Sequence, residues 1–200
     1  MKTNYPIPVR ERTINFPFEY YHYDKTNEFF VVPFHYHEDQ QLFRVIKGSV
    51  TISANSHLIT LNEGDCSVID AYAVHACQPC SEDTEYESIT FNLRDIYDLS
   101  MPHYSIIKMV VTHQLVVQTF FTQDSDKVIT DVIEDIFRHV HDDDLCTSIR
   151  LIGKLTNLFT LIVERNNYIL YDNEVVGRFY KHFTKANNVF RYIFDNYTKD

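Results

Sequence analysis

Three histidines carry the most specific chemistry in this sequence. His35 and His37 are two residues apart, so on a β-strand both imidazoles would point to the same face. Gln41 has the same parity, and His75 lies much further along the chain. Three neutral imidazoles that meet can bind Zn²⁺, Ni²⁺ or Fe²⁺ and leave coordination positions open. These four residues therefore form a candidate metal site, or alternatively a polar lining for an organic ligand.

Such a cluster forms only if the chain brings distant strands together. The N-terminal half contains short alternating or apolar runs bounded by turn residues, which is typical of strands in a barrel or sandwich. The strands are predicted at 15–23, 29–34, 41–46, 50–54, 57–61, 65–69 and 85–93. A closed antiparallel barrel of these strands would make the three histidines meet and could enclose one small ligand.

Beyond about residue 100 the apolar residues follow a helical period. Two helices are expected over about 125–140 and 145–165, joined by the short link Asp142–Asp144 into an antiparallel hairpin, and a third over 187–197. Residues 105–121 fit either a helix or a strand. A two-helix hairpin cannot bury two apolar faces by itself, so one face should pack on the barrel and another can pair with a partner subunit.

The histidine spacing resembles the first motif of the cupin superfamily. That motif reads H-x-H, three or four residues, E, six residues and G. Here the corresponding residues are His35, His37, Gln41 and Gly48 at matching intervals. Gln41 replaces the acid, so a bound cation would meet a neutral oxygen and the metal affinity should fall.

The second cupin motif is matched in spacing but less well in identity. It reads G, five residues, P-x-G, two residues and H, and here Gly64, Asp70, Tyr72 and His75 stand at those positions. Asp70 and Tyr72 thus replace the motif's proline and glycine.

Residues 33–95 as a whole resemble the N-terminal sensing domain of the AraC family of transcription regulators. The segments that carry the likeness are FHYHED at 34–39, RVIKG at 44–48, LNEGD at 61–65 and AVH at 73–75. The resemblance implies an α+β chain with an N-terminal arm and a cupin-like antiparallel β-barrel, or jelly roll, in residues 1–100. Residues 101–200 would form a helical dimerisation segment leading toward a helix-turn-helix domain that is missing from this chain.

That family implies a sensor that is not an enzyme. It would bind a small polar metabolite, such as a sugar, form a homodimer through helices at about 125–165, and contact DNA only through the missing domain. The expected effector-binding residues are Tyr20, His35, His37, Gln41, Phe43, Tyr72 and His75. The alternatives are a metal-dependent cupin enzyme, an oxygenase or isomerase, and a cupin binding module without DNA.

Charge and composition restrict the partners. The formal net charge of −10 makes this polypeptide alone a poor binder of nucleic acid. We find no signal peptide and no apolar run long enough to span a membrane, so a cytoplasmic protein with reduced cysteines is expected. Cys77 and Cys80 form a C-x-x-C pattern that could bind zinc with His75 or act as a redox pair, but incidental thiols in a turn are the favoured interpretation.

Overall fold

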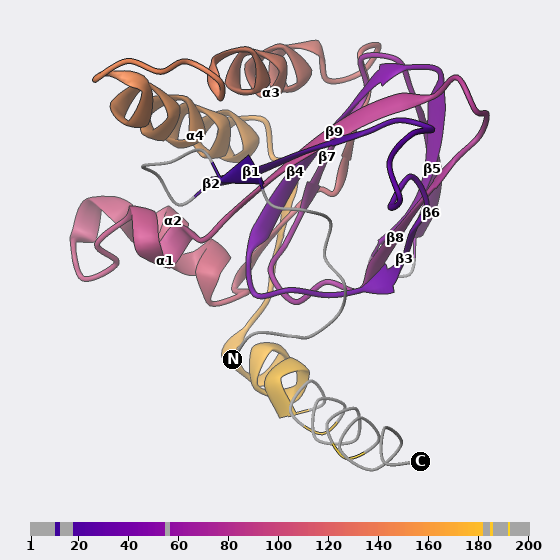
Figure 1. Cartoon of the computed structure of the whole chain (residues 1–200). Helices are drawn as coiled ribbons and strands as arrows, with labels where there is room; N and C mark the ends of the chain where they lie inside the picture. Colours follow the sequence, from indigo (N-terminus) through magenta and orange to yellow (C-terminus); the bar gives the residue numbers. More distant parts are fainter. Residues whose placement is uncertain (1–10, 13–17, 55–56, 182–184, 186–191, 193–200) are drawn as a thin grey trace.

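The strands of this protein form two main antiparallel sheets, with helices against one of them (Figure 1). The structure is a computed structural model that describes residues 11–12, 18–54, 57–181, 185 and 192. The six-stranded sheet has the order β1 (Glu11–Arg12), β2 (Phe18–Tyr23), β9 (Glu85–Phe91), β4 (Gln40–Lys47), β7 (Cys66–Ile69) and β11 (Phe120–Phe121). The four-stranded sheet has the order β3 (Val32–His35), β8 (His75–Pro79), β5 (Ser49–Ala54) and β6 (His57–Asn62).

The two sheets enclose one apolar core. Inward-facing side chains of both sheets pack together there, with stacked tyrosines at its centre: the rings of Tyr23 and Tyr86 are 4.6 Å apart. The buried members are Tyr21, Tyr23, Phe43, Val45, Val50, Ile52, Ala54, Leu61, Cys77 and Tyr86. Among the described residues no pairing joins a strand of one sheet to the other, so closure into the predicted barrel stays a prediction.

A second, larger core lies between the outer face of the six-stranded sheet and the helices. These are α1 (Leu93–Ile96), α2 (Ser105–Val111), α3 (Lys127–His139) and α4 (Thr147–Glu164), with a 3₁₀ turn at Pro102–Tyr104. The outward residues Phe18, Leu42 and Ile89 are buried against this layer. Because the sheet is covered on both sides, β4 is almost continuously buried instead of alternating.

Helices α3 and α4 pack on each other as the hairpin predicted from the apolar period. The buried stripe of α3 includes Ile129, Ile133 and Phe137, and that of α4 includes Leu155 and Leu158. None of the described helices is long and apolar enough to cross a bilayer.

The structure differs from the sequence predictions in several other elements. Residues 105–121, which fitted a helix or a strand, contain both: α2, then β10 (Leu115–Val117) and β11. β10 pairs with β12 (Tyr168–Leu170) in a two-stranded ribbon, and residues 173–181 form a further helix. Strand β8 was not predicted. The third helix, at 187–197, falls almost entirely outside the described residues.

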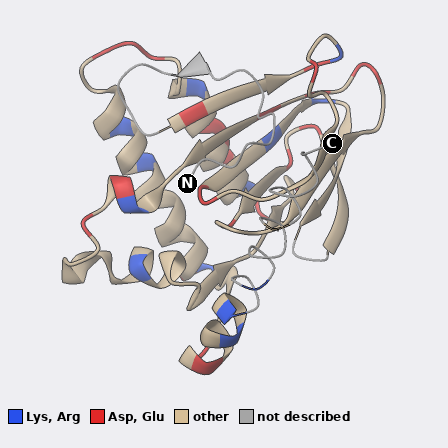
Figure 2. Ribbon diagram, turned by 60° about the horizontal axis from the view of Figure 1, so that its bottom comes forward, with Lys and Arg blue, Asp and Glu red and all other residues tan. Residues whose placement is uncertain are grey.

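Figure 2 shows basic and acidic positions interspersed over strands and helices.

Candidate metal centre

Strand pairing between β3 and β8 brings the histidines together. His35 ends β3 and His75 begins β8, and the two residues are paired in register. His37 lies two residues beyond β3, in the loop that leads to β4. The carbonyl oxygen of His37 accepts a hydrogen bond of 2.7 Å from the Tyr72 amide, which ties this loop to the one preceding β8. The predicted convergence of the three histidines is therefore confirmed.

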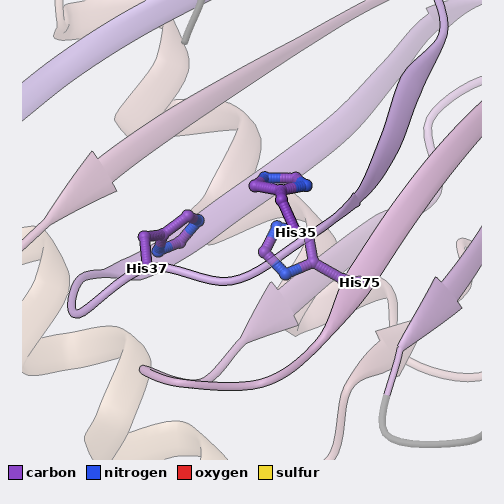
Figure 3. A group of neighbouring side chains, drawn as sticks. All are labelled: His35, His37 and His75. Atoms are coloured by element: carbon purple, nitrogen blue, oxygen red, sulfur yellow. The ribbon is translucent and has the colours of Figure 1, made fainter. Parts of the chain in front are cut away.

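The three imidazoles surround one point (Figure 3). The ring centroids of His35 and His75 are 4.1 Å apart, those of His37 and His75 4.9 Å, and those of His35 and His37 5.7 Å. One ligand nitrogen from each ring lies within 4.8 Å of those of the other two. His75 is buried, whereas His35 and His37 are half-buried, so the cluster is reachable from solvent.

Backbone carbonyls orient all three rings in the same way. The Nδ1 atoms of His35, His37 and His75 lie 2.9, 2.8 and 2.8 Å from the carbonyl oxygens of Pro33, Asp39 and Ala73. A carbonyl oxygen only accepts, so each neutral ring carries its proton on Nδ1 and keeps the Nε2 lone pair for a ligand. His75 Nε2 is buried and has no hydrogen-bond partner, as expected of a nitrogen atom that coordinates a cation.

Burial keeps the rings in the metal-binding protonation state. Desolvation is the main cause that lowers the pKa of His35, His37 and His75, and for His75 the two neighbouring histidines lower it further. Neutral imidazole is the form that binds metal ions. Three adjacent positive charges would also repel one another, so the cluster is neutral near pH 7.

A polar row of the six-stranded sheet runs beside the cluster. Glu19 and Gln41 are both register partners of Thr90, so all three share the inner face of β2, β9 and β4. Gln41 Oε1 lies 3.3 Å from His37 Nε2. An ion bound to His37 Nε2 would lie within reach of the Gln41 amide oxygen, so Gln41 is a candidate fourth ligand.

Glu19 is a site residue that sequence reasoning missed. Its carboxylate is near enough to His37 to favour the charged imidazole, and its Oε2 accepts a hydrogen bond of 2.7 Å from the Tyr21 hydroxyl. The carboxylate absent from position 41 is thus present on β2, in the same row. Only the pairing of β2 and β4 with β9 shows this, and no local pattern in the sequence does.

The other predicted binding residues lie elsewhere. Tyr20 is on the outer face of β2, where its hydroxyl donates to Glu87 Oε2 at 2.6 Å, so strand parity keeps it away from the histidines. Phe43 shares the inner face with Gln41 but is part of the core, 5.1 Å from the Tyr86 ring. Tyr72 has a φ of 65° and lies 6.1 Å from the His113 ring. The structure thus places His35, His37, Gln41 and His75 together and the three aromatic residues apart.

The cysteines do not join this centre. Cys77 is buried in strand β8 and Cys80 is exposed just beyond it, and both are free thiols. Burial raises the pKa of the Cys77 thiol to about 12, which makes it a poor ligand and nucleophile. The prediction that both lie in a turn was wrong for Cys77.

Comparison with known proteins identifies the domain. Residues 27–86, which include all three histidines, match the family model of the Cupin domain, and the chain therefore contains a cupin domain. No curated protein gives a significant match.

Several solved structures resemble part of this chain. KdgF from Halomonas sp. is 18% identical, with 45% of this chain and 84% of that chain covered and a TM-score of 0.35. The plu4264 protein from Photorhabdus luminescens is 20% identical, covering 48% and 88%, with a TM-score of 0.35. Oxalate decarboxylase of B. subtilis is 15% identical, covering 47% of this chain and only 26% of that chain, with a TM-score of 0.35. At these values the likenesses carry no argument about function.

The histidine cluster corrects one expectation from the sequence. A protein that is not an enzyme was expected, on the strength of a resemblance to regulators that no comparison shows. Three neutral imidazoles around one point, with an amide and a carboxylate in the neighbouring row, are instead suited to a metal-dependent catalyst. The expectation of no enzymatic activity is therefore abandoned.

Proposed function

We propose that this chain is a metal-dependent cupin enzyme with a divalent ion held by His35, His37 and His75. The observation that carries this proposal is the unpartnered, buried Nε2 of His75 beside two further imidazoles of the same tautomer. Gln41 would supply an oxygen ligand, and a barrel or jelly roll closed around the site would exclude bulk water. A bound Zn²⁺, Ni²⁺ or Fe²⁺ would act as a Lewis acid toward an oxygen of the substrate.

The residues of the chain itself have distinct tasks in this proposal. The carbonyl of Asp39 fixes the position of the His37 ring, and the carbonyl of Ala73 fixes that of His75. Glu19 is the acid or base, because it is the carboxylate that shares a row with Gln41 and acts electrostatically on His37. The substrate is a small polar molecule with oxygen donors, and the reaction class is an oxygenation or isomerisation.

Metal binding is tested on untagged protein, because a histidine tag would itself bind these ions. After treatment with EDTA, calorimetric titration with Zn²⁺ or Ni²⁺ should show about one ion per chain. His75→Ala should weaken binding at least about tenfold, or about 1.4 kcal/mol. His22→Ala, which removes an exposed histidine, should leave the affinity unchanged. Absence of a saturable heat in the wild type would refute the metal centre.

Turnover is tested separately from metal binding. The loaded protein is incubated with a panel of hydroxy acids, keto acids and sugars, and products are followed by NMR and dioxygen by an electrode. We expect turnover that Glu19→Gln abolishes while the metal stays bound. Saturable binding of one panel member without any turnover would contradict the enzyme and favour the sensor described next.

A second candidate is the effector-binding and dimerisation region of an AraC-type regulator. It is favoured by the large helical layer, which the metal centre does not need, and by the exposed side chains Leu145 and Ile149 on that layer. In this proposal the barrel binds a small polar effector, the helices form a homodimer, and a segment outside these 200 residues contacts DNA. An effector that alters the dimer would support it.

A further inference from the structure

A second site lies next to the metal centre but does not include it. A cavity of about 890 Å³ opens between β6, the loop 70–73, the ribbon of β10 and β12, and the helix 173–181. In Figure 1 this helix lies below the two sheets. None of the seven residues predicted to bind an effector lines the cavity. Its size is typical of sites for small organic molecules.

Two buried polar residues, Asp70 and His113, are among those that line this largely apolar space. Asp70 follows strand β7 and is 6% exposed, and the Val117 amide is the group that stabilises its charged form. His113 is 7% exposed and has a φ of 55°. A charged carboxyl buried in an apolar cavity is costly unless a ligand compensates for it.

No residue among the described walls of this cavity is a lysine or an arginine. His113 does not replace them, because burial and the nearby Arg94 guanidinium lower the pKa of its imidazole. Among the described residues, no lysine or arginine of the cavity wall thus pairs with Asp70. An anionic ligand would be repelled by this carboxyl, and a neutral one would leave it uncompensated.

Aromatic rings complete the wall. Phe120, Tyr168 and Phe179 line the cavity, and the Phe179 ring lies 5.0 Å from that of His113. The faces of such rings attract cations as well as apolar groups. A carboxyl and several aromatic rings are together complementary to an ammonium group attached to a hydrocarbon body.

We propose that this cavity binds a small organic amine, with its ammonium group on Asp70 and its apolar part against the aromatic wall. The ammonium would donate to the Asp70 carboxylate, which compensates the charge of this buried group. The net charge of −10 favours the approach of cations to this chain. This site is independent of the metal centre and does not rest on the proposed enzymatic activity.

The proposal is tested with three probes of equal shape and different charge. The whole chain, freed of metal with EDTA, is titrated calorimetrically with 2-phenylethylamine, 2-phenylethanol and phenylacetate. We expect the amine to bind at least about tenfold more tightly than the alcohol and the acid. Asp70→Asn should remove this preference, whereas Asp143→Asn, at an exposed aspartate, should preserve it.

Two further variants make the test decisive. Val176→Phe places a larger side chain in the cavity wall on an exposed helix and should weaken the amine at least about tenfold without depending on Asp70. His75→Ala should leave amine binding intact, so a failure of the metal centre is distinguishable. Equal affinity for the three probes, or an amine affinity that neither Asp70→Asn nor Val176→Phe changes, would overturn the proposal.

Discussion

The charge at position 41 determines how strongly the histidine cluster attracts a cation. Gln41 contributes only a neutral oxygen, 3.3 Å from His37 Nε2. Gln41→Glu adds a negative charge at that place, and we expect the Zn²⁺ dissociation constant to fall at least about tenfold. Calorimetric titration measures it. Gln78→Glu, at an exposed position of β8, changes the net charge equally and serves as the control.

An equal gain in Zn²⁺ affinity for Gln41→Glu and Gln78→Glu would show that the overall charge, and not position 41, controls the affinity. An unchanged affinity in Gln41→Glu would remove this residue from the proposed ligand set.

Asp70 is expected to destabilise the folded protein as the pH rises. Burial raises its pKa to about 7, from an ordinary value of 3.8. Its contribution to folding is therefore most favourable below pH 3.8 and is lost progressively as the pH rises to 7. Asp70→Asn should increase the free energy of unfolding by about 2–4 kcal/mol at pH 8 and by little at pH 4, as measured by urea denaturation.

The control is Asp143→Asn, which exchanges an exposed carboxyl and should be neutral at both values of pH. If Asp70→Asn increased the free energy of unfolding no more at pH 8 than at pH 4, the destabilising charge of the buried Asp70 carboxylate would be contradicted. The sequence identified position 70 only as the place of a missing proline in a cupin motif. Its burial depends on the β10 segment folding over it, which local sequence does not encode.

Among the secondary-structure elements, the six-stranded sheet carries one buried ion pair on the face that α3 covers. Arg44 on β4 and Glu87 on β9 are hydrogen-bonded, and the Arg44 guanidinium lies 5.0 Å from the Phe137 ring of α3. Glu87 is only 4% exposed and also accepts from Tyr20. Arg44→Ala leaves a buried carboxylate uncompensated and should cost about 3 kcal/mol of unfolding free energy.

Arg44→Met with Glu87→Leu removes both charges and should recover most of that loss, which urea denaturation of the single and double variants would show. A double variant as unstable as Arg44→Ala would mean that packing on Phe137 matters more than charge. The cover of Arg44 by α3 was not predicted from the sequence.

Strands were predicted correctly where apolar and polar residues alternate, and one strand was missed where a C-x-x-C pattern was interpreted as a turn. β5 and β6 follow the predicted runs 50–54 and 57–61 closely. β8 was missed because Cys77 and Cys80 suggested a turn, although His75, Cys77 and Pro79 alternate inward. Residues 105–121 were ambiguous because their β-branched residues are shared between a short helix and two short strands. Register, which places Glu19 in the same row of the sheet as Gln41, is a tertiary property that short-range patterns do not specify.

On the scale of the whole molecule, both halves of the chain contribute side chains to the larger of the two cores. Phe18 and Leu42 of the sheet pack with helical residues such as Ile133 and Leu158. The division at residue 100 into a sensing domain and a dimerisation segment stays a prediction. The histidine cluster and the cavity of Asp70 both adjoin the loop 70–73, because Ala73 lines the cavity while its carbonyl orients His75.

The helical layer leaves an apolar surface that a second copy of the chain is expected to cover. Leu145, in the turn before α4, has a relative exposure of 104%, and Ile149, in the first turn of α4, is 76% exposed. Burying such a side chain contributes about 1.5–3 kcal/mol, so these two residues favour association. We expect a homodimer in analytical ultracentrifugation that Ile149→Glu dissociates. Leu58→Glu is the matched control, because Leu58 on β6 is 74% exposed and belongs to the other sheet. A wild type that stays monomeric at high concentration would contradict the homodimer. A dimer that only Leu58→Glu dissociates would place the subunit contact on the four-stranded sheet instead of the helical layer.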